Sequence, residues 1–231
     1  MSKEKFSFYI NPEDPEKSVF RHKLIEEFRK DLEGRYEIPD NADGVVVLSA
    51  PPALEFQEVD RREKTPENIS RIDFAFDIWK QIAARKFHKK LDELDEEDLK
   101  DSSLPPFVLN GETEQLGPMR EIAMALGVPP EKIYSVDSGK RGASNTKTQF
   151  VETGRDGHLG QAKHLIFVSS SYHVPRVTRM GDMNLPKEMH FDVIGVPYDQ
   201  FSYDIRRKVR GEVKRIVAYS EKGDIAKWPR K

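Results

Sequence analysis

The chain has 231 residues, enough for one ordinary domain with an added subdomain and a sizeable buried core. Lys and Arg number 38 against 40 Asp and Glu, a balance that disfavours a dedicated nucleic-acid-binding protein. The lack of cysteine excludes disulfides, thiolate catalysis and cysteine-bound metals. No apolar run approaches the roughly 18 residues of a membrane helix, and residues 1–17 lack the apolar region of a signal peptide. We therefore expect a cytoplasmic protein with no membrane segment and no nucleic-acid partner.

In the first half of the chain, apolar runs alternate with helical patterns. Residues 18–32 predict an amphipathic helix, and residues 44–49 are short, apolar and β-branched, which is typical of a strand covered on both faces. Thr65 and Pro66 predict the start of a helix that carries an apolar stripe. The charged residues 86–106 are expected to form a partly helical insertion or connector.

The second half continues this alternation. A short helix is expected to stop at Gly127, and an apolar stripe over residues 205–217 predicts a long last helix. Further strands are predicted at residues 107–110, 132–136, 164–169 and 190–196. The pattern predicts an α/β fold, a Rossmann-like three-layer sandwich with a mostly parallel sheet of about five strands and helices on both faces. Ligands of such sheets bind at the carboxyl ends of the strands, near a topological switch point.

Polar residues follow the first two predicted strands. Ser49 ends the first, and Arg71 lies in the second turn of the next helix, off its apolar stripe. Asn110, Gly111 and Glu112 end the second strand. A solvated surface loop and a turn with a helix cap account for these residues equally well. A ribose, an amine or a metal held by the carboxylates is the functional alternative, and nothing local decides between them.

A glycine-rich basic loop follows the third predicted strand. Residues 139–142 read GKRG, and Ser144, Asn145 and Thr146 then open a helix. Glycines, cations and free N–H groups at a helix start suit an anion. Neither the P-loop pattern nor the dinucleotide fingerprint is present. The alternative is a flexible basic loop with a serine N-cap.

The fourth predicted strand runs into a polar turn where Pro175 indicates a helix start. His173 has a side chain suited to acid or base chemistry, and Arg176 is suited to clamping a carboxylate or phosphate. The alternative is an ordinary capped turn with a hydrogen-bonded histidine. The residues of this turn that we expect to face a ligand are Ser170, Ser171, Tyr172, His173 and Arg176.

Two catalytic classes lack their usual patterns. The G-x-S-x-G elbow of serine hydrolases is missing, which disfavours a covalent serine mechanism. The histidines form no H-E-x-x-H or H-x-x-E-H pattern, so no metal site is predicted.

Four segments stand in an order that resembles a known family. They are DGVVVLSA, the helix with RIDFAF, the stretch from FVLNGETEQ through GVPPEKIYSVDS to SNTKTQF, and HLIFVSSSYHVPRVTRM, and EVKRIVAYSEKGDI closes the chain in a similar way. Together they resemble the bacterial YdcF-like family, also called the DUF218 domain, with its SanA and ElyC relatives. Three features depart from the family: Ser49-Ala50-Pro51-Pro52 replace the usual glycines, no clean acidic residue precedes Ser144, and residues 86–106 look inserted.

The resemblance implies a Rossmann-like domain over residues 43–231, with residues 1–42 as an N-terminal helical extension packed on it. One branch of the family is associated with binding S-adenosylmethionine, so this cofactor is a candidate ligand, while the family's reaction is poorly defined. We expect a nucleotide-like or phosphorylated small molecule at the strand ends, with His173 as acid or base. The alternatives are a non-catalytic ligand sensor and an interaction protein that uses residues 86–106. The sequence predicts no oligomeric state.

Overall fold

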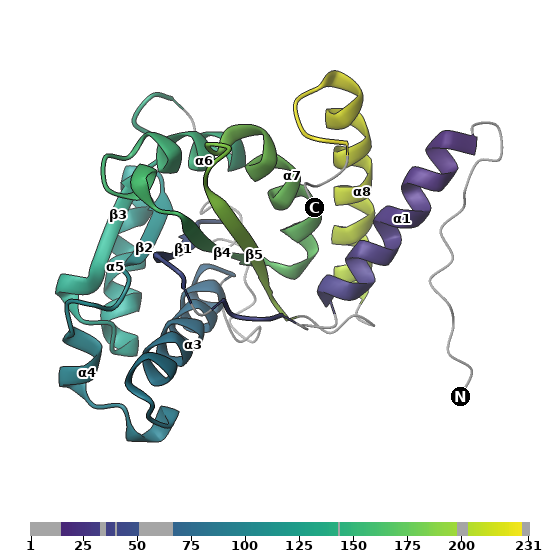
Figure 1. The fold of residues 1–231 in the computed structure, drawn as a ribbon. Coiled ribbons are helices and arrows are strands. Elements are labelled where there is room, and N and C mark those ends of the chain that lie inside the picture. The colour runs from purple at the N-terminus through teal and green to yellow at the C-terminus, as the bar shows by residue number, and fades with distance from the viewer. Residues whose placement is uncertain are drawn as a thin grey trace, which may run out of the picture.

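The computed structural model describes residues 15–32, 36–39, 41–50, 67–142, 144–197 and 203–227 (Figure 1). Its centre is a five-stranded, all-parallel sheet with the order β3-β2-β1-β4-β5. The strands are β1 (Gly44–Leu48), β2 (Phe107–Gly111), β3 (Ile133–Asp137), β4 (His164–Ser170) and β5 (His190–Val196). The structure thus confirms the predicted α/β fold with a parallel sheet and helices on both faces.

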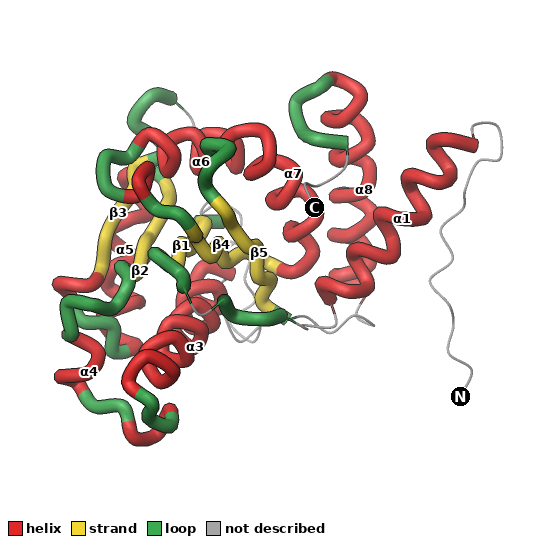
Figure 2. The backbone as a smooth tube through the Cα atoms, viewed as in Figure 1, coloured by secondary structure: helices red, strands yellow, loops and turns green. Residues whose placement is uncertain are grey.

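The described part of the chain contains seven α-helices, and six of them cover the two faces of the sheet, while α4 packs against α3 (Figure 2). One face carries α3 and α5, and the other carries α1, α6, α7 and α8. Their bounds are α1 (Pro15–Leu32), α3 (Glu67–Phe87), α4 (Glu96–Lys100), α5 (Thr113–Leu126), α6 (Thr146–Arg155), α7 (Val174–Asn184) and α8 (Tyr203–Lys222). None of these described helices is both long and apolar enough to cross a membrane.

The central strand β1 is apolar throughout because it is covered on both faces. Val46 and Leu48 pack into the core cluster beneath α1, α6, α7 and α8, whereas Val45 and Val47 pack into the cluster beneath α3 and α5. All five residues of the strand are buried. A strand of a parallel sheet that is covered on both sides needs apolar residues in both directions, as the run GVVVL provides.

The predicted elements agree with the structure to within a few residues. The fifth strand has the predicted bounds 190–196, and Gly127 ends α5 in a left-handed conformation with φ of 106°. The charged stretch 86–106 is partly helical, as expected: it holds the end of α3, a 3-10 turn at Leu91–Glu93, and α4. Thr65 and Pro66 lie outside the described residues.

The sheet order places a topological switch point between β1 and β4. These strands are hydrogen-bonded neighbours, with Val47 opposite Val168. The next described helix after β1 is α3, on one face, while β4 leads through a 3-10 turn (Ser171–His173) into α7 on the other face. The chain therefore diverges above their carboxyl ends, which is where such folds leave room for a ligand.

Candidate functional site

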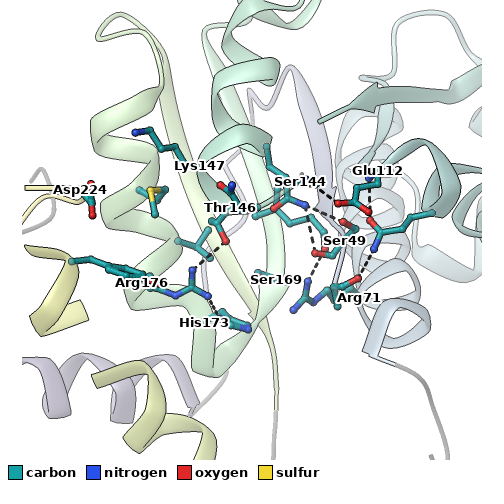
Figure 3. A pocket seen from close by; sticks show the side chains of 18 residues that line it. Ser49, Arg71, Glu112, Ser144, Thr146, Lys147, Ser169, His173, Arg176 and Asp224 are labelled. Atoms are coloured by element: carbon teal, nitrogen blue, oxygen red, sulfur yellow. Dashed lines mark hydrogen bonds between the residues drawn. The ribbon is translucent and has the colours of Figure 1, made fainter. Parts of the chain in front are cut away.

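A cavity of about 630 Å³ lies at the switch point (Figure 3). The ends of β1 and β4 form its floor, and residues of α3, α5, α6, α7 and α8 and their flanking turns contribute to its walls. The sequence-predicted residues that line it are Ser49, Arg71, Glu112, Ser144, Asn145, Thr146, His173 and Arg176.

Five other predicted residues support the cavity from outside its wall. Asn110 is fully buried, and its amide nitrogen donates to the Gln149 carbonyl at 2.9 Å and to Thr153 Oγ1 at 2.8 Å. A Cβ at Gly111 would come within 2.9 Å of Ser49 Cβ and 2.8 Å of Gln115 Oε1, so only glycine lets these elements approach so closely. Both positions fix the fold around the site rather than its inner surface.

The turn after β4 also faces mostly inward. Ser170 Oγ accepts two hydrogen bonds from Arg71, at 2.9 and 3.1 Å. Ser171 is fully buried, and its hydroxyl has no partner among the described residues. The Tyr172 ring belongs to the core and packs against the His173 ring, with 4.3 Å between the ring centroids. Of this turn, His173 reaches the cavity.

Arg71 is a buried cation that contacts the ends of two strands. Its side chain is only 3% exposed, and its guanidinium also donates to the Leu48 carbonyl at 2.8 Å. Leu48 ends β1 and Ser170 ends β4, so Arg71 holds the two strand ends on either side of the switch point. The charge is therefore fixed in place on the floor of the cavity before any ligand binds.

A polar network connects the opposite wall. Glu112 accepts a hydrogen bond from the Ser144 backbone N–H at 2.9 Å, and Ser144 Oγ lies 2.6 Å from Ser138 Oγ. The buried Gln149 amide donates to Ser49 Oγ at 3.0 Å. These bonds tie the loop before α6 to the ends of β1 and β2.

The N-terminus of α6 forms part of this wall. The serine N-cap considered as the alternative is wrong: Asn145 caps the helix, because its side chain accepts from the Thr148 N–H at 3.1 Å. Ser144 precedes the cap and is held by the carboxylate of Glu112 instead. Thr146 and Lys147, the first two helical residues, line the cavity.

His173 and Arg176 meet a buried carboxylate behind the cavity wall. Arg176 Nε donates to Glu212 Oε2 at 2.5 Å, and Glu212 Oε1 lies 3.4 Å from His173 Nδ1. Burial lowers the pKa of His173 below 6.5, although the nearby carboxylate acts in the opposite direction. Burial alone would raise the pKa of Glu212, but its contacts with His173 and Arg176 outweigh this and hold the pKa at about 2. Glu212 is therefore ionised and His173 neutral at pH 7.

Sequence reasoning missed several residues of the site. Glu212 lies on the apolar stripe of α8, next to Val209, Val213 and Ile216, and a lone acid on a buried face was the available signal. The missed residues that line the cavity are Leu48, Ala50, Gln115, Lys147, Gln149, Ser169, Val177, Met180, Tyr219 and Asp224. Most of them have no local pattern that marks them.

The cavity combines both charge signs with an apolar wall. Arg71, Arg176 and Lys147 are cations, and Glu112 and Asp224 are carboxylates. In the described ranges, no group of three or more His, Asp or Glu side chains is arranged to hold a metal ion. Such a lining suits an organic molecule with an anionic group and hydroxyls. Comparison of the chain with family models, curated proteins and solved structures finds no match.

Proposed function

We propose that the protein binds a nucleotide-like or phosphorylated small molecule in the cavity at the switch point. One observation carries this proposal: three cationic side chains, from α3, α6 and α7, line one cavity at the carboxyl ends of β1 and β4. The volume of about 630 Å³ lies within the roughly 300–1,000 Å³ of small-molecule sites.

The two kinds of wall suit different parts of such a ligand. Arg71 and Arg176 are placed to bind anionic oxygens, because guanidinium groups form paired hydrogen bonds with them. Glu112, at the end of β2, is placed to accept from ribose or sugar hydroxyls. Val177 and Met180 on α7 offer apolar surface to a base or another uncharged part.

We also propose membership of the YdcF-like family, in which S-adenosylmethionine is the particular ligand to test. The support is that two segments behind the resemblance, SNT and SYHVPR, contribute Ser144, Thr146, His173 and Arg176 to one cavity. A cytoplasmic location and the lack of a nucleic-acid partner rest on composition alone.

The test is a thermal-shift panel of S-adenosylmethionine, nucleotides, nucleotide sugars and sugar phosphates. A ligand at 100 times its dissociation constant stabilises the native state by about 2.7 kcal/mol, a shift that is readily measured. Lys147→Met and Lys140→Met form a matched pair, because both lysines are exposed but only Lys147 lines the cavity. We expect the first variant to weaken binding of an anionic ligand and the second to leave it unchanged. No stabilisation by any member of the panel would refute the proposal.

A non-catalytic sensor is the second candidate. The observation that favours it is the contact between Arg176 and His173 Nδ1 at 2.8 Å, because a ring nitrogen that accepts from a guanidinium is not free to act as a base. Product analysis after incubation with a bound ligand distinguishes an enzyme from a sensor. Turnover that is lost in His173→Gln would establish an enzyme, and binding without any product would establish a sensor.

A further inference from the structure

Arg176 uses only part of its hydrogen-bonding capacity within the protein. A guanidinium carries five N–H groups. Nε donates to Glu212 at 2.5 Å, one terminal nitrogen donates to Thr146 Oγ1 at 3.2 Å, and the other donates to His173 Nδ1 at 2.8 Å. No further partner occurs in the described ranges, so one N–H group remains on each terminal nitrogen. Because Arg176 lines the cavity, this pair is available to two oxygens of an anionic ligand.

The same contact determines where His173 carries its hydrogen. Nδ1 lies 2.8 Å from Arg176, which can only donate, and 3.4 Å from the carboxylate of Glu212, which can only accept. The shorter contact assigns Nδ1 as an acceptor, and the neutral ring then has its hydrogen on Nε2. Three charged groups act on this ring: Glu212 from α8, Arg176 from α7 and Arg71 from α3. Burial lowers the pKa of His173, in agreement with a neutral ring. No described residue accepts from Nε2, and His173 forms part of the cavity wall, so Nε2 is a third donor for a ligand.

Glu212 holds this arrangement from behind the wall. Its side chain is 0% exposed, is not part of the cavity lining, and contacts both Arg176 and Arg215 at 2.5 Å. The bond to Arg176 Nε fixes the plane of the guanidinium and thereby the direction of its two remaining N–H groups. Figure 3 shows the Arg176 guanidinium and the His173 ring side by side on one wall. Glu212 is thus a positioning residue that acts through Arg176.

We propose that Arg176 and His173, positioned by Glu212, form a subsite for a terminal phosphate group. Two donors from Arg176 and one from His173 match the three terminal oxygens of a phosphate monoester, whereas a carboxylate has only two oxygens. This inference rests on the proposed function and narrows it to phosphate monoesters, such as nucleoside monophosphates or sugar phosphates. S-adenosylmethionine carries a carboxylate and no phosphate, so it does not fill this subsite.

The test uses nitrogen-15 NMR of histidine-labelled full-length protein, with inorganic phosphate as the probe and acetate as the two-oxygen comparison. In the ligand-free protein we expect His173 to carry its hydrogen on Nε2 and none on Nδ1. Phosphate should shift the His173 Nε2 signal in a saturable titration, and acetate should bind more weakly. Losing one charge-assisted hydrogen bond costs roughly 1.5–3 kcal/mol, so Arg176→Lys and Glu212→Gln should each weaken phosphate binding at least about tenfold.

The control is Arg215→Gln. Arg215 contacts the same carboxylate, but its side chain is 55% exposed and lies outside the cavity wall, so phosphate affinity should be unchanged. Arg176→Lys keeps the test valid if Glu212→Gln does not fold. A hydrogen on Nδ1, no saturable phosphate shift, or equal affinity for phosphate in Arg176→Lys and the wild type would each overturn the subsite. If a panel ligand binds while phosphate does not, only the subsite fails; if neither binds, the proposed function fails as well.

Discussion

The guanidinium of Arg71 binds the hydroxyl of Ser170 through two nitrogens, at 2.9 and 3.1 Å, although the two residues are 99 positions apart in the sequence. The sequence suggested that both would contact a ligand. Instead, Ser170 orients Arg71, and Arg71 alone reaches the cavity. The position of this cation therefore depends on β4 as much as on its own helix.

Comparing Ser170→Ala with Ser171→Ala tests whether Ser170 matters because it orients Arg71 or only because it is buried. Both serines are fully buried, but Ser171 Oγ has no partner among the described residues. A buried hydrogen bond to a charged group contributes about 1.5–3 kcal/mol, so Ser170→Ala should lower the free energy of unfolding by about that amount and also weaken ligand binding. Ser171→Ala should change neither the free energy of unfolding nor ligand binding by much. Urea denaturation of the two variants measures the difference, and equal losses would contradict the role of Ser170.

Glu212→Gln should be strongly destabilising at pH 7. Removing one partner of a buried ion pair typically costs about 3–5 kcal/mol. Glu212 has its pKa lowered from 4.5 to about 2, so its contribution is present above pH 4.5 and is lost as the pH falls toward 2. The gap in stability between wild type and variant should close over this range, as followed by denaturant unfolding at a series of pH values. Arg215→Gln, at an exposed partner, should cost less than about 1 kcal/mol.

Asp31→Asn should stabilise the protein more at pH 8 than at pH 5. Burial, and then the charge of Glu27, raise the pKa of Asp31 from 3.8 to about 7. The unfolded state therefore releases this proton first, and the wild type loses stability as the pH rises toward and through 7. The advantage of the variant should grow by on the order of 2 kcal/mol between pH 5 and pH 8. Asp73→Asn, at an exposed position, is the control and should change the free energy of unfolding by less than about 0.5 kcal/mol.

Gly195→Ala should disturb the turn that carries His173. A Cβ at Gly195 would lie 2.4 Å from the Cα of Ser171, so the backbone must shift. We expect a loss of about 1–3 kcal/mol in the free energy of unfolding together with weaker ligand binding. Gly117→Ala provides the comparison, because its Cβ would meet nothing within 4 Å and alanine is favoured within a helix by about 0.5–1 kcal/mol. A Gly195→Ala variant that unfolds and binds like the wild type would show that the turn tolerates movement.

The fold was predictable because a strand that is buried on both faces has a continuous apolar sequence. A run such as GVVVL, at residues 44–48, can hardly be anything but a covered strand, and strands alternating with helices imply a parallel sheet. The general location of the site followed as well, because parallel strands bring their carboxyl ends to one edge. The directions of the side chains could not be predicted from the sequence. Asn110 and Ser170 lie at strand ends as expected, yet both side chains point into the protein.

The rest of the site depends on contacts between distant residues. Gln149 reaches Ser49, and Gln115 donates to the Ala50 carbonyl at 2.8 Å, across 100 and 65 positions. A glutamine in a helix carries no sign of such a partner. The sequence does mark Glu212, because an acid on an apolar stripe needs a buried cation as its partner. The stripe alone does not show that this cation is Arg176.

The position of β1 in the sheet has a consequence for how the protein is made. Phe167, the neighbour of Val46 on β4, is synthesised roughly 120 residues later, which at about 5–20 residues per second means on the order of ten seconds. During that interval one edge of a strand made of glycine, valine and leucine has no native neighbour and is prone to pair with other nascent chains. The strand at the floor of the cavity thus completes its pairing only late in synthesis.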